Sequence, residues 1–84
     1  MPQTFPPHLV AEVASLVELV TGTPSASVRP ESRFVDDLEV DSLSMIEVLE
    51  GLERRLGVVV ADSATSQLVH VGDLLDYLVT HGAR

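Results

Sequence analysis

Ser42 is the residue of this chain best placed for covalent chemistry, because it stands between an acidic stretch and a segment with helical periodicity. A serine nucleophile needs a neighbouring base and a third group that orients the base. Ser42 has no Gly-x-Ser-x-Gly context, and the three histidines, His8, His70 and His81, form no motif with it. We therefore predict that Ser42 is a site of covalent attachment in a protein that is not an enzyme.

The carboxylates before Ser42 have the alternate spacing of a calcium loop, at Asp37, Glu39 and Asp41. An EF-hand needs glycine at its sixth position and a bidentate glutamate at its twelfth. Those positions hold Ser42 and Val48 here. The chain also has no cysteine, which excludes thiolate ligands and disulfides. No metal site is predicted.

Negative charge is concentrated around Ser42. The 84 residues include 13 acids and 5 bases, for a net charge of −8. The segment from Glu31 to Glu53 holds eight of the acids and only one base, Arg33. Such a chain would be repelled by nucleic acids and by anionic membranes. The pattern indicates either a docking face for basic proteins or a solvated face that keeps the protein in solution.

The longest apolar runs are only a few residues, far below the roughly 20 residues that span a bilayer. Residues 1–4 carry neither the basic region nor the following apolar stretch of a signal peptide. We expect a cytoplasmic, monomeric protein with no membrane segment. Three prolines among residues 1–7 predict a flexible N-terminal arm, and the chain length predicts one domain over residues 8–82.

The first helix is predicted over residues 8–21, followed by Gly22 as a stop. Its apolar side chains recur at helical spacing and are Leu9, Val10, Val13, Leu16, Val17 and Val20. Residues 22–40 then form a long connection, which Phe34 and Leu38 are expected to anchor to the helices. A connection of this length is unusual unless it is packed down or functional.

The second helix is predicted over residues 42–56. Asp41 is a good N-cap, although Ser44 and Glu47 form an alternative capping box, and Gly57 provides the stop. A core stripe is expected at Met45, Ile46, Val48, Leu49, Leu52 and Leu56. Leu43 projects to the opposite side, in a sector shared with Glu47, Glu50 and Arg54. Because helix N-termini favour anions, a phosphodiester or a phosphate on Ser42 would be stabilised there.

The C-terminal part is predicted to begin with a buried connection at residues 58–60. A short helical turn follows over residues 64–68, capped by Asp62 or Ser63, and a last helix spans residues 71–81. The last helix has an apolar stripe at Val71, Leu74, Leu75, Leu78 and Val79. The expected fold is an all-α bundle with three main helices, one short helix and a long loop between the first two.

Residues 34–47 resemble the signature of acyl carrier proteins, and the resemblance extends from about residue 9 to residue 80. Asp41-Ser42-Leu43 matches the triplet that opens the second helix of that four-helix bundle, and a Phe-x-x-Asp-Leu pattern precedes it. The resemblance implies that Ser42 carries a 4′-phosphopantetheine arm, added from coenzyme A by a phosphopantetheinyl transferase. The thiol of the arm would hold a growing acyl or polyketide chain as a thioester.

The same resemblance implies roles for other residues. Asp41 would assist recognition by the transferase. Ketosynthase, acyltransferase and other synthase enzymes with basic docking patches would contact Leu43, Glu47 and Glu53. The acyl chain would be sheltered in a pocket lined by Ile46, Leu49, Leu52 and Leu56.

Departures from the best-known fatty-acid carriers suggest altered partner choice. Arg54 and Arg55 stand where a further acid is common, and Glu50 where an exposed apolar residue is common. Gly51 weakens the helix interior by up to roughly 1 kcal/mol. The departures leave open a fatty-acid, a polyketide or another specialised type II pathway. Two alternatives are an aminoacyl or peptidyl carrier, which more often has glycine before the serine, and an acidic helical interaction domain with unmodified or phosphorylated Ser42.

Overall fold

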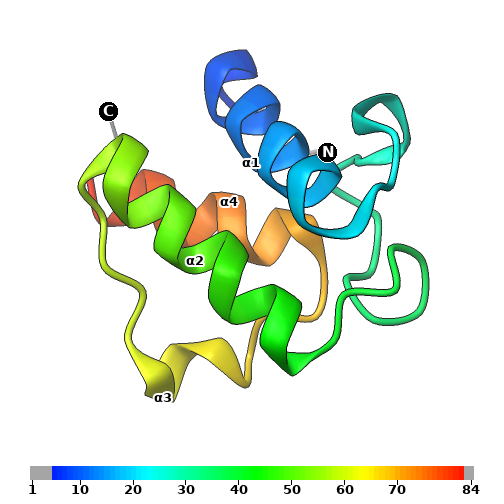
Figure 1. Ribbon diagram of the computed structural model, residues 1–84. Coiled ribbons are helices and arrows are strands. Elements are labelled where there is room, and N and C mark those ends of the chain that lie inside the picture. Colours follow the sequence, from blue (N-terminus) through cyan, green and yellow to red (C-terminus); the bar gives the residue numbers. More distant parts are fainter. Residues whose placement is uncertain (1–4, 83–84) are drawn as a thin grey trace.

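Three long helices form the body of the protein. The computed structural model describes residues 5–82, in which α1 packs against both α2 and α4, while the short α3 lies apart at the lower edge (Figure 1). The elements are α1 (Pro7–Thr21), a 3-10 turn η1 (Ser25–Ser27), α2 (Ser42–Leu56), α3 (Asp62–Thr65) and α4 (Val71–Thr80). The predicted all-α architecture, with three main helices and one short one, is confirmed.

The ends of α1 follow from local chemistry. Pro7 occupies the first turn, where its missing N–H costs no hydrogen bond. Gly22 ends the helix in the left-handed region, at φ +81°, and its N–H donates to the Glu18 carbonyl at 2.8 Å. The core side of the helix is buried, but Leu19 is 70% exposed.

Helices α1 and α2 approach closely at Gly51. A Cβ atom on Gly51 would lie only 2.5 Å from Cδ2 of Leu16, so no larger residue fits without a shift of Leu16. The glycine that weakens α2 by propensity therefore also permits the contact between α1 and α2.

The connection before α2 is anchored to the core, with Phe34 and Leu38 buried as expected. Phe34 and Leu38 are 1% and 2% exposed, and Val28 and Val40 are also buried. Three backbone hydrogen bonds join the connection to the start of α4. The Phe34 N–H donates to the Val69 carbonyl at 3.0 Å. The Val71 N–H donates to the Ser32 carbonyl at 2.8 Å, and the Gly72 N–H donates to the Pro30 carbonyl at 2.7 Å.

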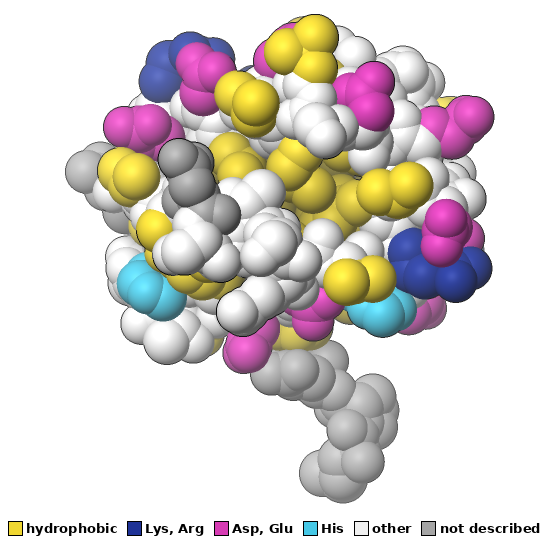
Figure 2. Space-filling view, turned by 90° about the horizontal axis from the view of Figure 1, so that it is seen from below, with side chains coloured by type: hydrophobic (Ala, Val, Ile, Leu, Met, Phe, Trp, Pro, Cys, Tyr) yellow, Lys and Arg dark blue, Asp and Glu magenta, His cyan; other side chains and the backbone are white. Residues whose placement is uncertain are grey.

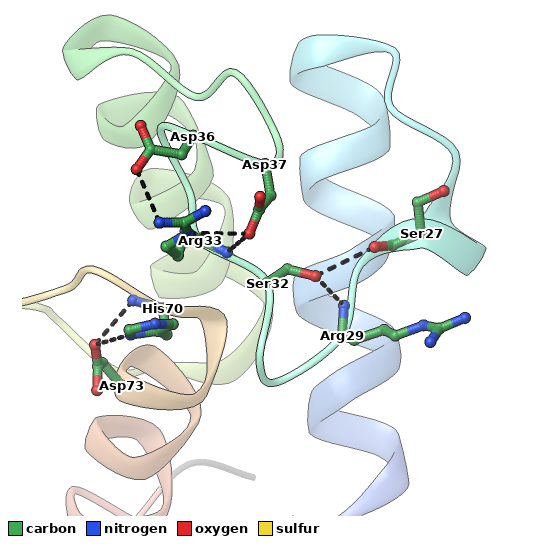
Figure 3. Close-up of polar contacts among 8 residues, drawn as sticks. All are labelled: Ser27, Arg29, Ser32, Arg33, Asp36, Asp37, His70 and Asp73. Atoms are coloured by element: carbon green, nitrogen blue, oxygen red, sulfur yellow. Dashed lines mark hydrogen bonds and ion pairs between the residues drawn. The ribbon is translucent and has the colours of Figure 1, made fainter.

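Side chains stabilise the same connection from within (Figure 3). The Ser32 hydroxyl donates to the Ser27 carbonyl at 3.3 Å and accepts from the Arg29 N–H at 3.1 Å. Glu39 has φ +56°, a conformation uncommon for a residue with a side chain. The chain reverses there, and the Val40 N–H donates to the Phe34 carbonyl at 2.8 Å. The reversal sets the direction in which the chain enters α2.

Some predicted burial is wrong. Ile46, Val59 and Val79 were expected inside, yet they are 52%, 64% and 48% exposed. Ile46 lies at the margin of its stripe and faces an open groove, so no other helix of the described residues covers it. Val58 is buried as expected and Val60 is half-buried.

The bounds of the C-terminal helices also differ from the prediction. α3 spans Asp62–Thr65 and not residues 64–68, and its N-cap is Ala61, so neither Asp62 nor Ser63 caps it. α4 ends at Thr80, one residue before the predicted end. His81 follows with its ring stacked on Tyr77, at a centroid distance of 3.8 Å.

The expected N-terminal arm falls partly outside the described residues, which begin at residue 5. Within it, Phe5 packs against the core and Pro7 is the first residue of α1. The arm over residues 1–7 therefore stays a prediction.

Phe34 is the largest buried side chain of the connection, so Phe34→Ala should lower the free energy of unfolding by about 3–5 kcal/mol. The neighbouring Val35 is 69% exposed, so Val35→Ala should change it by no more than about 0.5 kcal/mol. Urea unfolding followed by circular dichroism measures both values. Similar losses in the two variants would contradict an anchoring role for Phe34.

Candidate functional site

Ser42 is the first residue of α2, and its side chain is exposed. Asp41 precedes it in extended conformation, with φ −86° and ψ −176°. The Asp41 carboxylate accepts a hydrogen bond from the Ser44 N–H at 2.8 Å. Asp41 is therefore the N-cap, and the alternative box formed by Ser44 and Glu47 is not the one used.

The cap is ionised under ordinary conditions. The hydrogen bond from the Ser44 backbone N–H, helped by the Ser44 hydroxyl, lowers the pKa of Asp41 below its usual range. Two of the histidines are engaged with other residues: His70 Nδ1 lies 3.6 Å from an Asp73 carboxylate oxygen, and His81 stacks on Tyr77. No general base is assembled at Ser42 from these rings.

An open groove of about 740 Å³ begins beside Ser42 and runs between α2 and the segment around α3. Hydrophobic side chains gather at the centre of this face, with polar and acidic side chains around them (Figure 2). The apolar lining comes from both sides of the groove and comprises Val35, Val40, Met45, Ile46, Leu49, Val59, Val60, Leu68 and Val69.

Tyr77 of α4 attaches the first part of the outer wall of the groove. The Tyr77 hydroxyl donates to the Val59 carbonyl at 3.3 Å and lies 3.5 Å from the Ala61 N–H, which donates to it. These bonds hold residues 59–61 against α4. Val59 and Val60 belong to the groove lining, so Tyr77 helps to fix its width.

The residues expected to form a pocket do not all reach the groove. Ile46 and Leu49 line it, but Leu52 and Leu56 are 0% and 5% exposed and lie within the core. Sequence reasoning missed the lining from residues 59–69. The run of three valines at 58–60 was the one available signal, because Val58 faces the core and the next two line the groove.

The residues expected to meet partners fall on two sides of α2. Leu43 is 66% exposed, and Glu47 and Glu53 are exposed as well. Glu53 borders the groove beside Ser42, whereas Glu47 borders a smaller hollow between α1 and α2. Glu50 borders both.

Part of the negative charge near Ser42 is neutralised by Arg33 (Figure 3). Its guanidinium lies 3.4 Å from the carboxylates of Asp36 and Asp37. The Arg33 backbone N–H also donates to Asp37 and lowers the pKa of that carboxyl. Within residues 5–82, no group of three His, Asp or Glu side chains forms a metal-binding arrangement. The acids of α2, Glu47, Glu50 and Glu53, form no ion pair with any of the described residues.

A small helical bundle with an exposed serine at a helix N-terminus, beside an apolar groove, fits a carrier and not a catalyst. The family described as "Phosphopantetheine attachment site" matches residues 11–78. The chain is 41% identical over 71 residues to an acyl carrier protein of Acidothermus cellulolyticus, and the match covers 84% of each protein.

Two other relatives extend the comparison. A meromycolate extension acyl carrier protein of Mycobacterium leprae is 40% identical over 71 residues, which cover 84% of this chain and 62% of that protein. An acyl carrier protein of Thermobifida fusca is 38% identical over 66 residues, which cover 79% of this chain and 84% of that protein.

The chain therefore belongs to the acyl carrier protein family, and it is a non-catalytic carrier with a phosphopantetheine attachment site. Proteins of this family interact with synthase enzymes and with a phosphopantetheinyl transferase. None of the helices within residues 5–82 has the length and apolar character to cross a bilayer.

The ionised cap of α2 predicts a pH dependence. Asp41→Ala should lower the Tm, and Asp41→Asn should lower it less because the amide oxygen still accepts a hydrogen bond. The pKa of Asp41 is lower in the folded state than in the unfolded state, where it is about 4. The carboxylate therefore stabilises the fold fully above about pH 4. This stabilisation is lost as the pH falls through the pKa of the folded state. The Tm difference between wild type and Asp41→Asn should be steady from about pH 5 to 7 and shrink below about pH 4. Thermal melts across this range measure it, and a difference undiminished at about pH 2 would exclude the carboxylate as its source.

Proposed function

We propose that Ser42 carries the 4′-phosphopantetheine arm and that the adjacent groove shelters the acyl chain. The observation that carries the proposal is the position of the Ser42 hydroxyl, which is exposed, stands at the first residue of α2, and borders a 740 Å³ apolar groove. A group attached there is accessible to other enzymes and has an apolar surface within reach.

The residues present suit the arm. The free N–H groups and dipole at the start of α2 favour the phosphodiester on Ser42. Asp41 directs its carboxylate to the Ser44 N–H at 2.8 Å, which keeps the first turn of the helix formed while the transferase recognises it. When bound, the group supplies a thiol that holds an acyl chain as a thioester. The protein itself has no cysteine that could do this.

The groove suits a chain that is largely apolar. Ile46 and Leu49 provide one wall, and Val59, Val60 and Leu68 line it from the α3 side. Leu52 and Leu56 lie deeper in the core and would contact a chain only if the groove extended inwards. Arg33, Thr65, Ser66 and Glu53 add polar groups to the lining, so chains with some oxygen substituents also fit.

The carrier belongs, in this proposal, to a cytoplasmic type II fatty-acid or polyketide synthase and acts as a monomer. Ketosynthase and acyltransferase subunits would meet Leu43, Glu47 and Glu53 through basic patches. The relatives named above are two acyl carrier proteins and one meromycolate extension acyl carrier protein. The acidic residues before Ser42 favour an acyl over an aminoacyl cargo, since aminoacyl and peptidyl carriers more often have glycine there.

Incubation with coenzyme A and a phosphopantetheinyl transferase should add the mass of one phosphopantetheine arm to the protein. Ser42→Ala should abolish the gain. Ser44→Ala, two residues further along α2, should retain it. Intact-mass spectrometry measures all three proteins. A gain that persists in Ser42→Ala would refute the assignment of the serine.

Shelter in the groove predicts protection of the thioester. We expect an octanoyl chain, loaded from octanoyl-coenzyme A, to be cleaved by hydroxylamine at least about threefold faster in Ile46→Ser than in wild type, because apolar contact with the chain is lost. Val79 has a similar exposure on α4, so Val79→Ser is a matched control with no expected effect. An acetyl chain is too short to reach the groove wall and should show no difference. Equal cleavage rates for the octanoyl forms would exclude Ile46 from the shelter.

A further inference from the structure

One face of α2 carries an ordered series of exposed side chains. Leu43, Glu47, Glu50 and Arg54 recur at every third or fourth position, so they lie on one side of the helix. At a rise of 1.5 Å per residue, this mixed-charge stripe is about 16 Å long. It is apolar at the end next to Ser42, acidic in the middle and basic at the far end.

The two arginines at the end of α2 differ in their surroundings. Arg55 is held by α1, because its guanidinium lies 3.6 Å from Glu12 and 3.5 Å from the Ser15 hydroxyl. Arg54 is exposed, and its side chain forms no ion pair with any of residues 5–82. The positive charge of the stripe is therefore available to a partner.

A hollow of about 360 Å³ lies beside the stripe, between α1 and α2. Leu16, Leu19 and Val20 line it from α1, and Glu47, Glu50, Gly51, Arg54 and Arg55 from α2. Gly51, which has no side chain, leaves room between the other residues on the α2 side. Leu19, 70% exposed, offers an apolar contact next to Arg54. This hollow is separate from the groove beside Ser42, with which it shares only Glu50.

We propose that a synthase subunit docks on this stripe with a bipolar surface. Its basic side chains face Glu47 and Glu50, an acidic side chain faces Arg54, and an apolar side chain enters the hollow against Leu19. A uniformly basic surface would repel Arg54, so the charge pattern selects the partner. The proposal rests on the carrier function, and it adds that the direction of α2 on the partner is fixed by charge.

Arg54→Glu tests the proposal through the sign of its effect. The probe is a purified ketosynthase of the type II synthase from the source cells, assayed for acyl transfer from the octanoyl-loaded carrier. If the docking surface of the ketosynthase is bipolar, Arg54→Glu should raise the KM for the carrier about three- to tenfold at low salt. Facing a uniformly basic surface, the same variant should lower the KM, because the face becomes more acidic.

Arg29→Glu is the matched control, since Arg29 is exposed, lies outside the hollow and undergoes the same change in charge. It should alter the KM less than about twofold. Glu47→Arg should raise the KM. The KM increases of Arg54→Glu and Glu47→Arg should largely disappear at about 1 M salt, where the Debye length is about 3 Å. A lowered KM for Arg54→Glu, or equal changes for Arg54→Glu and Arg29→Glu, would overturn the proposal.

Leu19 tests the apolar part. Leu19→Ser should raise the KM at low and at high salt, whereas Val79→Ser on α4 should not. If sedimentation shows a dimer of the carrier that Leu19→Ser dissociates, the hollow binds a second copy and the proposal is wrong. Loading of every variant by the phosphopantetheinyl transferase is measured first by mass. Failure of wild type to load would refute the carrier function itself, whereas normal loading with unchanged KM values would refute the docking proposal alone.

Discussion

The position of Ser42 depends on backbone hydrogen bonds between two segments that are far apart in sequence. The connection before α2 is bonded to the start of α4 at Phe34, Ser32 and Pro30, and the Phe34 side chain is buried in the core. Because the Val40 N–H then bonds back to Phe34, the chain enters α2 from a fixed point. The exposed serine is thus placed by the core together with the Asp41 cap, and its hydroxyl stays available for modification.

The charge that a partner meets on this protein is determined more by local ion pairs than by the net charge. The net charge of −8 suggests a uniformly acidic surface, but Arg33 offsets two of the acids in the loop and Arg55 offsets Glu12. The acids that remain exposed on α2 are Glu47, Glu50 and Glu53. They are followed by Arg54, which forms no ion pair with any of the described residues. Since exposed charges act over about a Debye length, a partner senses this short pattern and not the total.

The sequence predicted the long helices well because their ends are chemically marked. α2 has the predicted bounds, since Asp41 caps it and Gly57 ends it in the left-handed region. α3 was misplaced because a four-residue helix shows no periodicity, and its N-cap is an alanine. The exposure of Ile46 could not be predicted from its stripe, because it depends on how far α3 stands from α2. The groove could not be predicted for the same reason, because about a third of its lining comes from residues 59–69.

The groove has one stiff wall and one soft wall. The α2 wall is continuous with the core. The opposite wall is anchored at its two ends, by buried Val58 and the Tyr77 hydroxyl at one end and by buried Leu68 and the Val69 backbone at the other, while the described residues 63–67 between them are half-buried or exposed. Displacing the middle of this wall, residues 63–67, disrupts few buried contacts, so its free energy of opening is small compared with that of global unfolding. The cavity can therefore adjust its volume to cargoes of different length while the helix that presents them to other enzymes keeps its shape.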